Sequence, residues 1–141
     1  MVRKWKIDGL IDILVKQHDT RDPFKIAKQK EVIILWEELG DIFGYYNKVS
    51  RIPFIHINCN LSYKKQRFTC MHELGHVICH PDENTPQLSA ISLCSEIIIE
   101  AEANYFATKL AIDGSHQNEY IQTKYDLLHY YGLPGEMIKF L

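Results

Sequence analysis

The chain has 141 residues, of which 46% are hydrophobic and 24% charged, and its formal net charge is −2. This length fits a single domain, residues 1–141, that buries about two thirds of its unfolded surface, and the composition excludes disordered and fibrous proteins. No apolar run approaches the roughly 18 residues of a membrane span, and the N-terminal segment has no continuous apolar core. We therefore expect a cytoplasmic protein with no membrane partner.

The basic residues and the cysteines add two further expectations. Basic clusters such as Lys64, Lys65 and Arg67 are short and scattered, which is typical of solvated faces, so no direct nucleic-acid binding is expected. The 4 cysteines include no CxxC pair. They predict reduced, mostly buried thiols.

The first elements in chain order are helical. Residues 1–19 carry an amphipathic pattern that predicts a helix. Its core-facing side chains are expected to be Trp5, Leu10, Ile13 and Leu14. Pro23 then permits a short helical turn from about Phe24, since proline is tolerated in the first turn of a helix.

Three strands are predicted next. Residues 31–36, EVIILW, form an apolar and β-branched run of strand length. Residues 41–48 place aromatic side chains around Gly44, where the strand can bend, and residues 51–60 have the composition of a third strand. Because the connections are short, we predict that the three strands pair locally as a meander.

The second half of the chain predicts helices at 61–79, 95–111 and 118–131 and a short final helix at 135–141. Asn60 or Ser62 can cap the first of these, and Pro81 ends it. Gly114 and Gly132 follow the next two, as is common after a helix C-terminus. The predicted fold class is α+β, with a three-stranded sheet packed against a helical cluster.

The segment CMHELGHVIC places His72 and His76 four residues apart, with Glu73 beside the first. On a helix, positions i and i+4 differ by about 40° of rotation and about 6 Å of rise, so the two imidazoles can converge on one ion. Glu73 lies about 100° away from His72, where it can reach a water on the metal but is poorly aimed as a ligand. This is the HExxH pattern of zinc peptidases, in which the glutamate is the general base.

A catalytic zinc needs a third protein ligand and one open position. The following apolar helix contains two carboxylates, Glu100 and Glu102. A carboxylate in a packed helix face is costly unless it is paired or bound to a metal. The histidine pair in one helix and the carboxylates in the next apolar helix together favour a metal site over a buried helix that happens to contain histidines.

The residues RFTCMHELGHVICH, followed by IEAEANYFATKLAI, resemble the ImmA/IrrE family of metallopeptidases. Members carry HELGH and then a helix of the form ExxANxFAxxLL; this chain departs from that form only at the helix end, where it has LAID. The resemblance implies a small zincin-like domain with Zn²⁺ as cofactor. It also implies an intracellular endopeptidase, often encoded by phages and mobile elements, whose protein substrate is a DNA-binding repressor.

Within the family pattern, the glutamate four residues before the asparagine corresponds to Glu100. Glu100 shares a helical stripe with Asn104, Ala107 and Ala111, and Asn104 is suited to steadying a ligand. Glu102 lies about 200° away around the helix and is expected at the rim or in solvent. The resemblance therefore favours Glu100 as the third zinc ligand.

Other polar residues near the motif have plainer explanations. His80 stands at a helix end, where a histidine bonded to carbonyls is expected. His56 in the third strand is either a substrate contact or a satisfied structural histidine, and Cys70 and Cys79 are expected to pack in the core. The aromatic residues at 43–46 are expected in the sheet core, with one tyrosine as a possible donor to the reaction intermediate.

The resulting hypothesis is a zinc endopeptidase with His72, His76 and Glu100 as ligands and Glu73 as base. The alternative is a non-catalytic zinc-containing module that docks a repressor or regulator without cutting it. A third hypothesis is a DNA-binding regulator that uses residues 125–141 as a helix-turn-helix, but that segment is poor in Arg and Lys.

Overall fold

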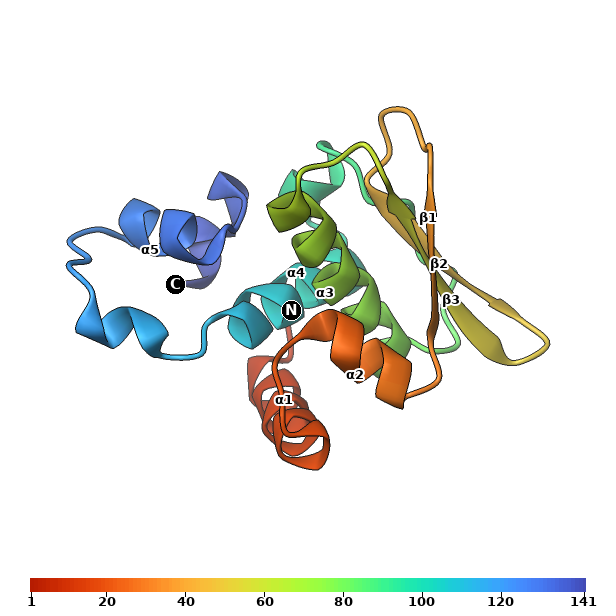
Figure 1. Cartoon of the computed structure of the whole chain (residues 1–141), viewed down its shortest axis with the longest axis horizontal. Coiled ribbons are helices and arrows are strands. Elements are labelled where there is room, and N and C mark those ends of the chain that lie inside the picture. The colour runs from red at the N-terminus through yellow and green to blue at the C-terminus, as the bar shows by residue number, and fades with distance from the viewer.

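The computed structural model describes residues 1–141 and has a three-stranded sheet at one side of a helical cluster (Figure 1). The two helices predicted to carry the site, α3 (Tyr63–Cys79) and α4 (Ile98–Ala111), pack directly on each other, and α3 also packs on the sheet. The structure therefore confirms the α+β fold class and the packing of helices on the sheet. The remaining elements are α1 (Lys4–His18), α2 (Pro23–Gln29), β1 (Ile33–Glu37), β2 (Gly44–Val49), β3 (Ile52–Asn58), η1 (Ser92–Cys94), η2 (Ser115–Asn118), α5 (Lys124–Tyr131) and η3 (Gly135–Phe140).

The strand order is β1-β3-β2, so the predicted meander is wrong. β2 and β3 form an antiparallel hairpin, whose two loop residues, Ser50 and Arg51, both have positive φ angles, of 51° and 67°. Two such residues are typical of a tight hairpin turn that matches the strand twist. β1 instead pairs in parallel with β3, on the side away from β2.

The connection 38–43 explains this order, because it carries the chain across the end of β3. Two strand spacings amount to roughly 10 Å, which a short connection easily spans. Asn58, at the end of β3, holds the crossing in place: its side-chain amide donates to the carbonyl oxygens of Gly40 and Ile42, at 2.9 Å each. A short connection therefore did not require its two strands to be neighbours.

The buried face of α1 also differs from the prediction. Ile7, Ile11 and Leu14 form the buried stripe, whereas the side chains of Trp5 and Ile13 are 80% and 64% exposed. The buried residues follow the i, i+4, i+7 spacing of one helix face.

The helix predicted at 118–131 is wrong in its first half. Residues 119–123 are not helical, and α5 begins only after Thr123, whose side chain and that of Asp126 form a reciprocal capping box. Such a box satisfies two of the free N–H groups at a helix start, which fixes the boundary at this position. The final helix is present as η3, a short 3₁₀ helix.

The thiols are less buried than predicted. All four cysteines are free, but only Cys70 is buried; Cys79 is half-buried, and Cys59 and Cys94 are exposed. No helix of the structure has the length and apolar character needed to cross a membrane.

The close packing of α3 on α4 depends on Gly75. A Cβ at this position would lie only 3.0–3.2 Å from atoms of Phe106, whose side chain is fully buried in α4. Glycine is a poor residue for a helix interior, so its presence here reflects the space that the Phe106 ring needs. This contact sets the short distance between the two helices that carry the candidate site.

The backbone of β2 is tightly packed at Gly44. A Cβ there would lie 2.4 Å from the carbonyl oxygen of His56 and 2.6 Å from a methyl carbon of Thr69. Gly44→Ala should therefore lower the free energy of unfolding by at least about 1–3 kcal/mol, the usual cost of overpacking. Gly9→Ala, in the open middle of α1 with no atom within 4 Å, should raise it by about 0.5–1 kcal/mol. Urea denaturation of both variants measures the difference; equal effects would contradict the packing at Gly44.

Candidate metal centre

The HELGH residues lie in the middle of α3, which begins after Ser62. The Ser62 hydroxyl accepts a hydrogen bond from the backbone N–H of Lys65, and His80 ends the helix before Pro81. His72 and His76 are both fully buried, and their ring centroids are 4.8 Å apart. The predicted convergence of the two imidazoles is therefore present in the structure.

Glu100 reaches the point where the two imidazoles converge. Its Oε1 atom lies 2.7 Å from Nε2 of His76 and 3.4 Å from Nε2 of His72. Glu100 is itself 1% exposed and belongs to the first turn of α4. One carboxylate oxygen and two imidazole nitrogens from two helices thus face a common point inside the protein.

The outer nitrogen of each histidine is held by a neighbour. Nδ1 of His72 lies 2.8 Å from the side-chain oxygen of Asn104, one turn along α4 from Glu100. Nδ1 of His76 lies 3.0 Å from Nδ1 of His80. Hydrogen bonds of this kind orient the rings and leave Nε2 of each free to face the common point.

Glu73 is fully buried beside these residues, and its two carboxylate oxygens have no hydrogen-bond partner. A carboxylate oxygen of Glu73 and a ring nitrogen of each of His72 and His76 lie within 4.8 Å of one another. Burial raises the pKa of Glu73 to about 8, against the opposing influence of His72 and with a smaller contribution from the charge of Glu100. Glu73 can therefore gain or lose a proton near neutral pH, and no neighbouring group holds its carboxyl by a hydrogen bond.

The donor atoms of this cluster fit a bound cation. Nε2 of His72, both oxygens of Glu73 and Oε2 of Glu100 are buried without a partner, although buried polar atoms are nearly always paired. Burial lowers the pKa of His76 to about 4. Burial alone would raise the pKa of Glu100, but His72 and His76 lower it to about 2. A neutral imidazole beside an ionised carboxylate is the protonation state in which these groups bind a metal.

The environment of Glu102 contradicts the prediction that it lies at the rim or in solvent. It is 1% exposed, and its carboxylate accepts hydrogen bonds from the side chain and the backbone N–H of Arg3, at 2.9–3.0 Å. Hydrogen bonds from Arg3 and His80 lower the pKa of Glu102 to about 2, although burial alone would raise it. Glu102 is buried because α1 packs on α4 and Arg3, just before α1, supplies its partner.

His80 also differs from the prediction. Its ring does not bond carbonyl groups: Nδ1 faces His76, and Nε2 lies 2.9 Å from Oε1 of Glu102. Sequence reasoning thus missed the link from Glu102 through His80 to His76. Two signals pointed to it, since His80 continues the i, i+4 series of His72 and His76 and Glu102 is a second carboxylate in an apolar helix.

The other polar candidates lie outside the cluster. Both ring nitrogens of His56 have partners, Glu37 and the side-chain oxygen of Asn47, and its ring stacks on Tyr45. The structure therefore favours the structural explanation for His56. The buried Tyr46 donates its hydroxyl to the carbonyl oxygen of Pro81, at 3.1 Å.

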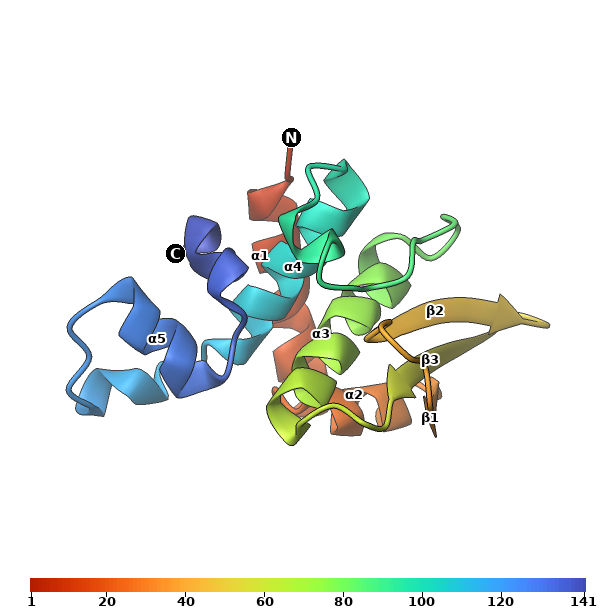
Figure 2. The ribbon, with the colours of Figure 1, turned by 90° about the horizontal axis from the view of Figure 1, so that it is seen from above.

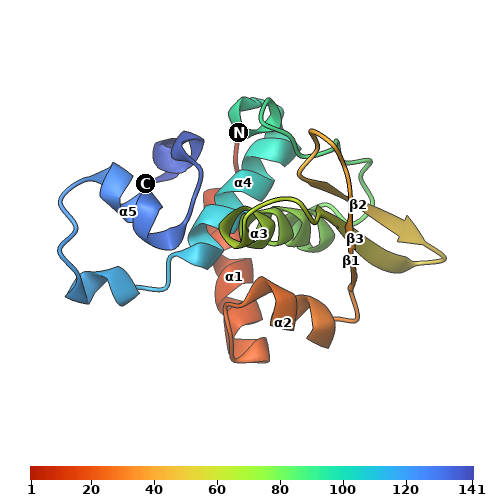
Figure 3. The same ribbon diagram turned by 45° about the horizontal axis from the view of Figure 1, so that its top comes forward.

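The cluster is closed to solvent, because His72, Glu73 and His76 are 0% exposed and Glu100 is 1% exposed. The connection between α3 and α4, residues 80–97, crosses the space between β2 and the start of α4 (Figures 2 and 3). It is fixed to the sheet at Leu88, whose N–H donates to the carbonyl of Gly44 and whose carbonyl accepts from the N–H of Phe43.

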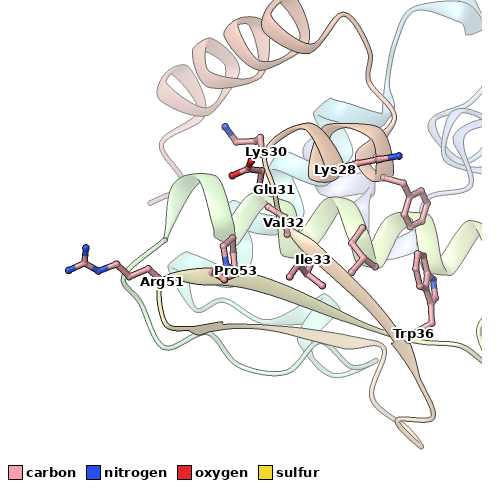
Figure 4. A pocket seen from close by; sticks show the side chains of 11 residues that line it. Lys28, Lys30, Glu31, Val32, Ile33, Trp36, Arg51 and Pro53 are labelled. Carbon is pink, nitrogen blue, oxygen red and sulfur yellow. The ribbon is translucent and has the colours of Figure 1, made fainter.

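A separate surface cavity of about 810 Å³ lies between α2 and β1 (Figure 4). Its apolar wall includes Phe24, Ile33 and Trp36, and Lys28 and Lys30 also line it. None of the buried cluster residues lines it. Its size therefore says nothing about access to the histidines.

Comparison with known proteins shows the family to which the chain belongs. Residues 17–140 match the family described as the IrrE N-terminal-like domain, Peptidase_M78. The chain belongs to the ImmA/IrrE family of metallopeptidases. This confirms the resemblance that the HELGH and ExxANxFA segments indicated.

Two curated relatives share most of this family domain. The chain is 33% identical over 135 residues to "Uncharacterized immunity region protein 2" of Bacillus phage phi105, a match that covers 93% of this chain and 85% of the relative. It is 30% identical over 132 residues to "Metallopeptidase ImmA" of Bacillus subtilis strain 168, covering 89% of this chain and 77% of that protein. The family implies a metallopeptidase, and the buried His/Glu cluster is its candidate metal site.

The environment of Glu73 generates a pH prediction for the metal-free protein. Its pKa is about 8 when folded and about 4.5 ordinarily. At a pH between these two pKa values, Glu73 is ionised in the unfolded chain and still protonated in the folded chain. Stability therefore falls as pH rises, by at most about 1.4 kcal/mol per pH unit. Glu73→Gln cannot titrate, so it should gain stability relative to wild type between pH 5 and about 8.

Urea denaturation of the metal-free protein in chelator, at several pH values, measures this gain. Glu96→Gln, which alters an exposed glutamate just before α4, is the control and should follow the wild type at every pH. If Glu73→Gln also followed the wild type, Glu73 would not be held in its protonated form by burial.

Proposed function

We propose that this protein is a zinc-dependent endopeptidase that hydrolyses a peptide bond in a protein substrate. The proposal rests mainly on one observation: Nε2 of His72, Nε2 of His76 and Oε1 of Glu100 face one buried point, while Glu73 lies beside it without a partner. Two imidazoles and one carboxylate are a known ligand set of catalytic zinc, which keeps a further position open. Membership of a metallopeptidase family supports the same conclusion.

In this proposal His72, His76 and Glu100 hold the metal, and their neighbours keep them in place. Glu100 is preferred to Glu73 as a ligand because Oε1 of Glu100 is near Nε2 of both histidines. Asn104 accepts a hydrogen bond from Nδ1–H of His72, which leaves the lone pair on Nε2 of that ring directed at the metal position. A zinc ion bound there supplies Lewis acidity and lowers the pKa of a water molecule to about 7.

Glu73 is the proposed general base. Its carboxyl takes a proton from the attacking water and delivers it to the leaving amine, a role that typically contributes about 10²–10⁴-fold to the rate. The absence of any hydrogen-bond partner for Glu73 suits this role, because neither oxygen is held by a neighbouring group. In the metal-free protein burial gives Glu73 a pKa of about 8, and a cation bound beside it would lower that value.

The proposed substrate is a DNA-binding repressor of a phage or mobile element, met in the cytoplasm. One relative is named as an immunity region protein of a phage and another as the metallopeptidase ImmA, which supports a role in the same kind of system. Direct nucleic-acid contact is not part of the proposal, because a chain with net charge −2 lacks the basic excess of a nucleic-acid binder.

One observation favours the alternative, a zinc-containing module that docks a repressor without cutting it. The whole cluster is buried, so a peptide bond cannot reach Glu73 in the conformation described. A docking module has no need for an open site. It also has no need for a buried glutamate without a partner, which is why the peptidase is preferred.

The metal content follows from the proposed ligands. Purified protein should hold close to one zinc per chain, and His76→Ala and Glu100→Ala should each lose most of it. Zinc present at about 100 times its Kd adds about 2.7 kcal/mol to the free energy of unfolding. Both variants should lose this gain, whereas Glu96→Ala should keep it. Elemental analysis and thermal denaturation with and without zinc measure these effects; full zinc retention by either variant would show that a ligand is misassigned.

Catalysis is tested by co-expressing the protein with candidate DNA-binding repressors of phages or mobile elements. Wild type should produce a specific fragment, and Glu73→Gln should not, although it still folds, binds zinc and binds the same partner. The loss of cleavage should reach about 10²–10⁴-fold, because only the base is removed. If wild type and Glu73→Gln both leave the partner intact and relieve repression equally, the docking module is the correct function.

A further inference from the structure

A chain of polar contacts leads from the N-terminus of the protein to the candidate metal centre. Arg3 is bonded to Glu102, Oε1 of Glu102 lies 2.9 Å from Nε2 of His80, and Nδ1 of His80 lies 3.0 Å from Nδ1 of His76. The three inner members are 3% exposed or less. The contacts join α1, α4 and α3 in that order.

The chemistry at the outer end fixes the direction of the hydrogen bonds to Glu102. Arg3 donates to both carboxylate oxygens of Glu102 through Nε and Nη2, and its backbone N–H also donates to Oε2. A carboxylate held by an arginine is ionised and can only accept. Nε2 of His80 must therefore carry the proton in this contact.

This assignment bears on the tautomer that His76 adopts when it binds a metal. In the metal-free structure Nε2 of His76 lies 2.7 Å from Oε1 of Glu100, an ionised carboxylate that can only accept, so Nε2 carries a proton there. A metal must replace that proton, because only an unprotonated nitrogen can bind a metal. The one proton of a neutral, metal-bound His76 is then on Nδ1, and a neutral His80 protonated at Nε2 presents the lone pair that accepts the hydrogen bond from it.

We propose that Arg3, Glu102 and His80 are positioning residues for the metal centre, which hold His76 in the tautomer that presents the Nε2 lone pair to the metal. This inference rests on the proposed function, because it takes the metal to lie between His72, His76 and Glu100. It extends the usual pairing of a ligand histidine with a carboxylate by inserting a second histidine between them. It also gives α1 a part in metal binding.

The first test measures zinc affinity by competition with a chromophoric chelator, using the full chain. His80→Leu fills the space of the ring but can neither accept nor donate, and it should weaken zinc binding by about 10- to 100-fold. His80→Gln offers both an acceptor and a donor and should recover most of the affinity. Arg3→Met should weaken binding in the same direction as His80→Leu.

Tyr105→Phe is the matched control. The Tyr105 hydroxyl donates to Asp8 at 2.7 Å and thus also ties α4 to α1, but it does not contact the histidines. It should lower the stability of the metal-free protein and leave zinc affinity unchanged. If Tyr105→Phe and His80→Leu weaken zinc binding equally, or if His80→Leu binds zinc as tightly as wild type, the positioning role is overturned.

The second test needs no variant and so remains decisive if His80→Leu fails to fold. Nitrogen NMR of histidine side chains in the zinc-loaded wild type should show His76 protonated at Nδ1 and neutral His80 protonated at Nε2. A proton on Nδ1 of His80 would overturn the inference. The inference would also be overturned if the wild type bound two zinc ions per chain and His80→Leu bound one, because His80 would then be a ligand. A wild type that binds no zinc would instead refute the proposed function.

Discussion

The structure around the site depends on the need to pair two carboxylates that α4 buries against α3. Glu100 and Glu102 are each 1% exposed, and each lies close to histidines of α3. Leaving one such charge unpaired inside a protein costs several kcal/mol. Glu100 meets His72 and His76, while Glu102 meets His80 one turn further along. The two helices cannot slide or rotate against each other without breaking both sets of contacts, so the pairing also fixes the relative placement of the four residues proposed for catalysis.

Much of this centre could be predicted from the sequence because its decisive features are local. The spacing of His72 and His76 is a property of a single helix, and helical geometry shows that these two side chains can converge. The choice of Glu100 in the next helix came from the resemblance to the family pattern. The three strands were also found, and their ranges were correct to within a few residues. The order of the strands was not, because the choice of neighbour depends on where the connection 38–43 crosses, and Asn58 stabilises that crossing from another strand.

The errors at Glu102 and Trp5 share one physical cause. A helical wheel gives the direction of a side chain around its own axis but not what lies in that direction. Glu102 is two positions from Glu100 along α4, and Arg3, just before α1, supplies a partner that the wheel does not show. Trp5, in the same α1, is 80% exposed although the amphipathic pattern predicted a core position. Both residues depend on the docking of α1 on α4, which involves residues about a hundred positions apart and leaves no local pattern.

The burial of the candidate site has a consequence for the proposed peptidase activity. When the competent conformation is only a fraction of the population, the apparent affinity for a substrate falls in proportion to that fraction. If the protein is the peptidase proposed above, the closed conformation cannot cleave a protein substrate, because the cluster is buried. For such a peptidase, a shift of about 1.4 kcal/mol toward an open form would raise proteolysis about tenfold.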